Sequence, residues 1–92
     1  MKYKLILSPE AKEDIEAYRQ AGNKSQLKKI SVIFHELEYH PKIGTGKPKK
    51  LKYKKSDLWS RRIDRKNRLL YRIEEGIITV IVIAAKNHYD DK

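Results

Sequence analysis

Residues 77–85 read IITVIVIAA, and this run constrains the fold more than any other part of the 92-residue chain. It is almost entirely apolar, which predicts a strand in the centre of a sheet, covered on one face. Residues 74–76 (EEG) predict a tight turn before it, and residues 68–73 (RLLYRI) a strand before that turn. The C-terminal part of the chain is therefore expected to be a β-sheet.

The N-terminal half predicts a short strand followed by two helices. Residues 3–7 (YKLIL) form the strand. In SPE at 8–10, serine suits an N-cap, proline the first helical turn and glutamate the positive end of the helix dipole. The first helix should end at 22–23 (GN) with a left-handed cap, and the second should cover 24–39 and stop before Pro41. Its apolar stripe, interpreted as core packing, consists of Leu27, Ile30, Phe34 and Leu37, with Ile33 beside it.

Two further strands complete the pattern, at 58–63 and, as a shorter candidate, around 51–53. The order is then β-α-α-(β)-β-β-β. The predicted fold class is α+β, with two N-terminal helices packed on one face of a mainly antiparallel four- to five-stranded sheet. Residues 1–92 are expected to form a single domain. The other face of the sheet should be open and polar.

The composition excludes several kinds of site. The chain has no cysteine, which rules out a disulfide framework, a thiolate nucleophile and a cysteine zinc site. The three histidines (His35, His40 and His88) lack the spacing of metal ligands, so no metal or other cofactor is predicted. The first ten residues are too briefly apolar for a signal peptide, and no run reaches transmembrane length. We therefore expect a cytoplasmic protein that does not enter a membrane.

Positive charge is concentrated in one segment. Residues 47–72 contain twelve Lys or Arg and two acids, and so carry the whole net charge of +10. Such a segment indicates contact with nucleic acid or the ribosome; the alternative is a solvated face that confers solubility. The preceding loop, IGTGK at 43–47, lacks the spacing of a phosphate-binding P-loop.

Strand alternation places two arginines on the open face. Arg62 and Arg68 both point away from the predicted core, and they lie opposite each other only if the loop between the strands has an odd number of residues, for example 64–66. Paired arginines repel each other, but their planar forks match the oxygens of a phosphate. The same alternation puts Trp59, Ile63, Leu69, Tyr71 and Ile73 on the core face, and Ser60, Leu70 and Arg72 on the open face.

His88 and Tyr89 follow the last strand. A histidine exchanges a proton near neutral pH, and a tyrosine offers a stacking ring and a hydroxyl. The alternative is an ordinary polar strand end.

Three stretches together resemble the YoeB/Txe toxins of the RelE-like group: GTGKPKKLK (44–52), LWSRRIDRKNRLLYRI (58–73) and the terminal HY (88–89). The resemblance implies a RelE-like, microbial RNase-like fold. It also implies the toxin of a type II toxin–antitoxin system, an endoribonuclease that cuts mRNA in the ribosomal A site. The implied partners are mRNA, the ribosome and a cognate acidic antitoxin. An apolar edge and the family likeness suggest a homodimer.

The family's functional positions can be matched one by one. The sequence departs from the family at Lys49, where relatives have the glutamate taken as the general base, and in the tail at 90–92 (DDK). Either a lysine takes over the missing role or the enzyme is weak. The positions of this sequence that correspond to the family's functional residues are Lys49, Lys52, Arg62, Arg68, His88 and Tyr89.

The implied chemistry is attack by the ribose 2′-hydroxyl on the adjacent phosphorus, which requires no metal. The hypothesis assigns the scissile phosphate to Arg68 and the role of general acid to His88. Lys49 is either the base or a cation that stabilises the transition state. The supporting residues are Tyr89, which would orient a base or the phosphate, and Lys47, Lys52 and Arg62, which would bind RNA.

Two alternatives remain open. The first is a module of the same fold that binds RNA or the ribosome with little or no catalysis, paired with an antitoxin. The second is a basic structural protein associated with ribosomal RNA.

Overall fold

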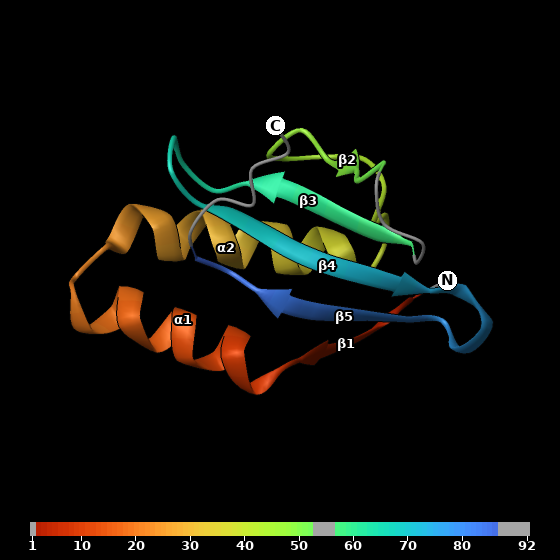
Figure 1. Ribbon diagram of the computed structural model, residues 1–92, viewed down its shortest axis with the longest axis horizontal. Helices are drawn as coiled ribbons and strands as arrows, with labels where there is room; N and C mark the ends of the chain where they lie inside the picture. The colour runs from red at the N-terminus through yellow and green to blue at the C-terminus, as the bar shows by residue number, and fades with distance from the viewer. Residues whose placement is uncertain (1, 53–56, 87–92) are drawn as a thin grey trace.

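The computed structural model describes residues 2–52 and 57–86. The strands form one sheet in the order β1-β5-β4-β3-β2 (Figure 1). β1 is parallel to β5, and the remaining neighbours are antiparallel. The elements are β1 (Lys4–Leu7), α1 (Pro9–Gln20), α2 (Lys24–Leu37), β2 (Lys49–Lys50), β3 (Leu58–Arg62), β4 (Arg68–Glu74), a 3-10 turn (Glu75–Ile77) and β5 (Thr79–Ala84).

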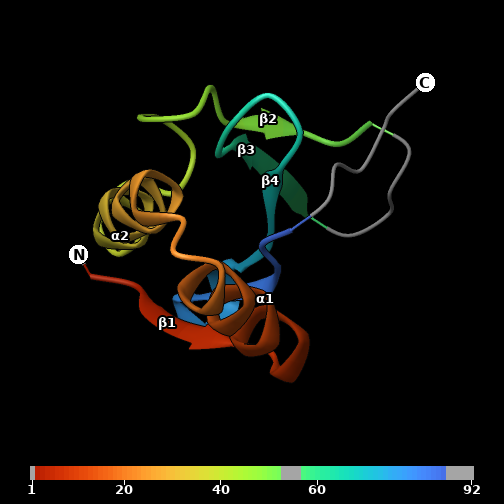
Figure 2. The ribbon, with the colours of Figure 1, turned by 90° about the vertical axis from the view of Figure 1, so that its left-hand side faces the viewer.

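Both helices lie on the same side of this five-stranded sheet (Figure 2). The predicted α+β class is therefore confirmed. None of the described helices is both long enough and apolar enough to cross a bilayer.

Three predicted elements have a bound that is wrong by two residues or more, whereas the other strand ends agree to within one residue. The short strand expected around 51–53 is formed by Lys49–Lys50, one position beyond Pro48, and Tyr53 lies outside the described residues. The last strand begins at Thr79 rather than Ile77, because 75–77 form a 3-10 turn and Ile78 takes a left-handed conformation (φ 49°). The second helix ends at Leu37, two residues before the predicted end.

Local capping determines where α1 begins and ends. The Ser8 hydroxyl accepts a hydrogen bond from the Ala11 amide (3.0 Å) and donates one to the Ile83 carbonyl (2.7 Å), so it joins the helix to β5. Gly22 has a φ of 71°, as expected for a left-handed cap. Both predicted ends of this helix are therefore confirmed.

The core lies between the two helices and the sheet. It consists of buried residues from α1, α2, β4 and β5, together with Ile63 and Ala85, and half-buried Leu27, Phe34 and Trp59 pack against it. Ile33 was predicted to lie beside the apolar stripe of the second helix, and in the structure it is completely buried. The main buried side chains are Ala11, Tyr18, Ile30, Ile33, Leu37, Leu69, Tyr71, Ile73, Val80 and Val82.

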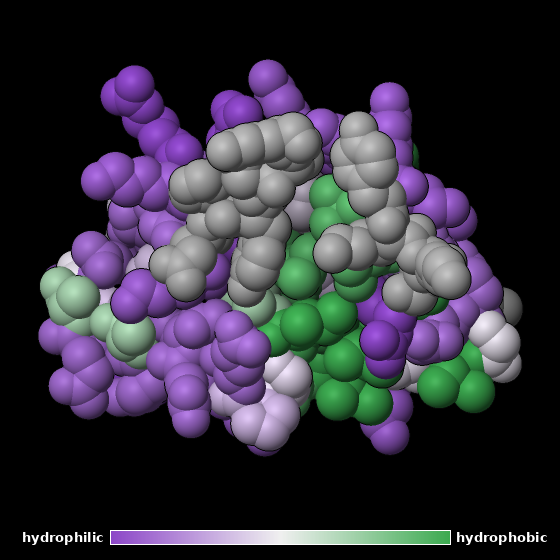
Figure 3. All heavy atoms as spheres, in the orientation of Figure 1, coloured by the Kyte–Doolittle hydropathy of each residue, from purple (hydrophilic) through white to green (hydrophobic). Residues whose placement is uncertain are grey.

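The open face of the sheet is not uniformly polar, and this expectation was wrong. Strand register puts Leu70, Ile81 and Ile6 on the face away from the helices. Leu70 is buried, whereas Ile6 is exposed. Figure 3 shows an apolar area on this face beside a strongly hydrophilic one. One reason is that β5 is apolar at nearly every position, so both of its faces carry apolar side chains, and its neighbours β4 and β1 add Leu70 and Ile6.

Candidate functional site: a cation cluster on the open face

The β3–β4 hairpin brings Arg62 and Arg68 directly opposite each other. Residues 63–67 join the two strands, and the amide of Ile63 donates to the carbonyl of Asn67 (2.9 Å), which leaves 64–66 as the turn. The loop length is odd, so the predicted pairing of the two arginines is confirmed. Directly opposed residues have Cβ atoms about 5 Å apart, close enough for both guanidinium groups to contact one anion.

Asp64 holds this hairpin turn in place. Its carboxylate accepts hydrogen bonds from the amides of Lys66 (2.8 Å) and Asn67 (2.7 Å), and Gln26 in α2 donates to it (3.1 Å). Partial burial raises the pKa of Asp64, but the hydrogen bonds from Asn67, Gln26 and Lys66 outweigh burial and lower it. The turn that joins Arg62 to Arg68 is thus tied to the helical layer by an ionised carboxylate.

Neither arginine of this pair has a carboxylate partner among residues 2–52 and 57–86. Arg72, which lies in β4 with Arg68, does have a carboxylate partner, because its Nε donates to Glu74 (2.6 Å). Arg62 is exposed and Arg68 is half-buried. Two like charges placed opposite each other repel, so this pair favours a bound anion.

The edge strand β2 adds Lys49 to the same face. Lys49 pairs with Ser60, and Ser60 pairs with Leu70, so all three side chains point away from the helices. Ser60 is two residues from Arg62, a spacing of about 7 Å along a strand. We call Lys49, Arg62 and Arg68 the cation cluster.

The other two lysines predicted to bind RNA lie at opposite ends of β2. The Arg62 amide donates to the carbonyl of Gly46 (2.7 Å), which places Lys47 beside Arg62. The Leu51 amide donates to the carbonyl of Leu58 (2.9 Å), so Lys52 follows at the other end of β3, away from Arg62. The backbone therefore brings Lys47 to the cluster and leads Lys52 away from it.

His88 and Tyr89 lie outside the described residues, as does the tail at 90–92. The chain before them is anchored to α1. Tyr18 donates to the carbonyl of Ala85 (2.7 Å), and the Ala85 amide donates to Asp14 (2.9 Å). Because burial, with smaller contributions from Asp64 and Asp14, raises the pKa of Tyr18 to about 12, this hydroxyl remains a donor.

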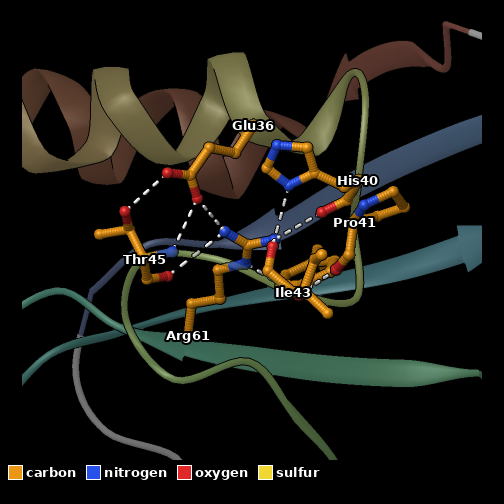
Figure 4. A network of polar contacts seen from close by, with 7 residues as sticks. Glu36, His40, Pro41, Ile43, Thr45 and Arg61 are labelled. Atoms are coloured by element: carbon orange, nitrogen blue, oxygen red, sulfur yellow. Dashed lines mark hydrogen bonds and ion pairs between the residues drawn. The ribbon is translucent and has the colours of Figure 1, made fainter.

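Arg61, next to the cluster residue Arg62, is the residue that the sequence interpretation did not single out. Its side chain is completely buried, and Nη1 lies 2.6 Å from Oε1 of Glu36 in α2 (Figure 4). Alternation offered a signal: Arg61 falls on the same face as Trp59 and Ile63. An arginine on a core face requires a buried partner.

Every N–H of the Arg61 guanidinium has an acceptor. Nε donates to the hydroxyl of Tyr71 (3.1 Å), which in turn donates to the carbonyl of Pro41 (2.8 Å). The remaining donors bind Glu36 (2.6 Å) and the carbonyls of Thr45 (3.3 Å), His40 (3.1 Å) and Ile43 (2.9 Å) (Figure 4).

Glu36 accepts hydrogen bonds from Thr45 as well as from Arg61. Its carboxylate accepts from the Thr45 amide (2.8 Å) and hydroxyl (2.6 Å). Partial burial raises the pKa of Glu36, but the hydrogen bonds from Thr45 and Arg61, with the charge of Arg61, outweigh burial and lower it. The group is therefore an ionised partner of Arg61 at neutral pH.

Two glycines allow the loop to pack this closely. A Cβ at Gly44 (φ 127°) would lie 2.3 Å from Oε1 of Glu36, and a Cβ at Gly46 (φ 84°) would lie 2.7 Å from the carbonyl oxygen of Arg62. GTGK is thus required for close contact with α2 and β3. Among the described residues, no three His, Asp or Glu side chains cluster as metal ligands.

Comparison with known proteins places the chain in a family. The model of the YoeB-like toxin of bacterial type II toxin–antitoxin systems matches residues 7–89. The chain is 37% identical over 86 residues to Toxin YoeB of Escherichia coli O6:H1, an alignment that covers 94% of this chain and 99% of the relative.

Solved structures of YoeB proteins have the same fold as this chain. The YoeB dimer from Staphylococcus aureus superposes with a TM-score of 0.82 at 30% identity, covering 97% of this chain and 100% of that one. The YoeB-YefM complex from the same organism has a TM-score of 0.77 at 31% identity, with the same coverage. The chain therefore belongs to the YoeB family of toxins of bacterial type II toxin–antitoxin systems.

Proposed function

We propose that this toxin is an endoribonuclease that cleaves mRNA in the ribosomal A site. The observation that carries the proposal is the direct pairing of Arg62 with Arg68 on the open face, with Lys49 two residues away in register. Three cations from three strands converge there without a carboxylate partner for either arginine in the described ranges. Such a cluster suits a phosphate that gains negative charge during a reaction.

In the proposed reaction, the 2′-hydroxyl of the substrate attacks the adjacent phosphorus and expels the 5′-oxygen. Because the RNA supplies its own nucleophile, the protein has to position the phosphate, stabilise charge and move protons. Arg68 and Arg62 would bind the phosphoryl oxygens, with Lys47 and Lys52 on the flanking RNA. His88 remains the proposed general acid, and Tyr89 the residue that orients a base or the phosphate.

The proposal is tested by mapping cleaved ends on a message translated in a purified system. We expect cuts at codons in the A site, and none when ribosomes are omitted. Ribosome binding should also weaken with salt, with a log–log slope of about −2 or steeper if three phosphates on single-stranded RNA are contacted. Intact message together with a flat salt dependence would exclude both cleavage and the role of the cation cluster.

Lys49 favours a second candidate, a toxin that occupies the ribosome with little cleavage. The family glutamate is absent there, and a lysine can act as a base only in its uncharged form. This candidate predicts steep salt dependence without cleaved ends.

Substitution of Lys49 separates its possible roles. We expect Lys49→Ala to reduce single-turnover cleavage about tenfold, in either role. If Lys49 acts as the base, Lys49→Glu should restore the rate; if it stabilises charge as a cation, Lys49→Glu should cleave more slowly than Lys49→Ala. Lys50→Ala is the matched control, because Lys50 is exposed on the other face of β2.

The partners follow from the relatives and the charge. The Staphylococcus aureus YoeB proteins were solved as a dimer and with YefM. We propose that this toxin likewise forms a homodimer, and that an acidic antitoxin neutralises its net charge of +10 by covering the cation cluster. Its place of action would be the cytoplasm, where ribosomes translate.

A further inference from the structure

We infer that Glu36 and Arg61 are positioning residues that place the edge strand β2, and with it Lys49, beside Arg62. The inference rests on the proposed RNA-cleaving function, which the cation cluster would serve. Neither side chain belongs to the cluster: Arg61 is completely buried, and both groups lie on the helix side of the sheet.

The two residues hold Thr45 at three points. Glu36 accepts from its amide (2.8 Å) and from its hydroxyl (2.6 Å), and Nη1 of Arg61 donates to its carbonyl (3.3 Å). Arg61 also binds the carbonyls of His40 and Ile43, earlier in the same loop. The loop from 40 to 45 is therefore fixed to one buried guanidinium.

Thr45 lies only four residues before Lys49, so the position of Thr45 affects the position of the cluster residue Lys49. The residue after Thr45, Gly46, accepts a hydrogen bond from the Arg62 amide (2.7 Å), and Lys47, which has a left-handed φ of 53°, lies two residues before β2. β2 is only two residues long, and both are exposed. An edge strand this short contributes little burial of its own, so the loop anchor acts together with the pairing to β3 in setting where Lys49 lies.

The need to hold the loop carbonyls in one arrangement explains why the Glu36–Arg61 ion pair is used here. A buried pair of charges can often be replaced by apolar residues without loss of stability, so stability alone does not call for one. Apolar side chains could not bind the loop carbonyls that converge on Arg61. A planar guanidinium satisfies them in one fixed arrangement.

Two matched pairs of variants test the inference. Thr45→Val removes the hydroxyl that binds Glu36 and keeps the shape, whereas Thr45→Ser keeps the hydroxyl. Glu36→Gln removes the partly buried charge, and Glu16→Gln, in the exposed pair with Arg19, makes the same change of net charge.

Two measurements are made on each full-length variant. The first is backbone hydrogen exchange. The second is single-turnover cleavage of mRNA on programmed ribosomes, with the ribosome concentration either saturating or limiting.

We expect Thr45→Val and Glu36→Gln to exchange about tenfold faster at the amides of residue 45 and Arg62, with β4 and β5 unaffected. Their cleavage rate at saturation should fall about tenfold or more, and the half-saturating ribosome concentration should change less than about threefold. Thr45→Ser and Glu16→Gln should resemble wild type. The loss in Glu36→Gln is opposite to what added positive charge alone would do.

Faster exchange throughout the sheet would show a merely structural role and overturn the inference, as would local loosening with an unchanged cleavage rate. If the wild type does not cleave at all, the proposed function fails, and the inference is then judged on ribosome binding. A shallower salt slope in Glu36→Gln than in Glu16→Gln would support positioning of the cations, and equal slopes would reject it.

Discussion

Arg68→Ala is expected to reduce single-turnover cleavage of mRNA on programmed ribosomes by about 100-fold. Arg68 lies opposite Arg62 and is half-buried, so its fork is the better held of the two groups that would bind the scissile phosphate. Removing a donor aimed at developing negative charge has a large effect because no solvent molecule is fixed in its place. Unfolding in urea should change little, since this side chain makes no ion pair within the described residues.

Arg65→Ala is the control for this experiment. Arg65 is exposed in the turn of the same hairpin, and its loss changes the net charge equally. Its cleavage rate should stay within about threefold of wild type, because distant surface charge acts mainly on association. Equal rates for Arg68→Ala and Arg65→Ala would contradict the assignment of Arg68. Arg68→Lys should fall between Arg68→Ala and wild type, since it retains charge without the bidentate fork.

Arg61→Met is expected to have the largest effect on stability, lowering the free energy of unfolding by about 3 kcal/mol. The substitution leaves the Glu36 carboxylate without its cation and several loop carbonyls without donors. Exposure of Glu36, with 18% of its side chain accessible, gives some relief by solvation, so we expect the lower end of the usual range. Urea unfolding at neutral pH measures the change.

Two further variants check this explanation. Arg65→Met should change the free energy of unfolding by less than about 0.5 kcal/mol, because it alters an exposed arginine. The double variant Arg61→Met with Glu36→Met should recover part of the loss, since it removes the unpaired carboxylate. A double variant less stable than Arg61→Met alone would mean that the loop carbonyls, rather than the unpaired charge, account for the cost.

Local patterns predicted the order of elements and one part of the candidate site. The Ser8 cap, the Gly22 cap and the apolar run at 77–85 each depend on neighbouring residues, and the structure agrees with all three apart from shifted ends. The pairing of Arg62 with Arg68 also followed from local information, because the parity of a short loop decides which residues of a hairpin face each other.

Contacts between distant segments decided the rest. Glu36 and Arg61 are 25 residues apart, and no pattern near either residue says that a helix and a strand will bring them within 2.6 Å. Likewise, the close approach of the loop at Gly44 and Gly46 exists only when α2 and β3 are packed together. The sequence alone therefore determined which residues are cationic and which face of a strand they occupy, because alternation and charge are local properties. Tertiary packing decided where the edge strand carrying Lys49 lies, because that position depends on pairing with β3 and on the contacts of Glu36 and Arg61 with the preceding loop, all of which join separate elements.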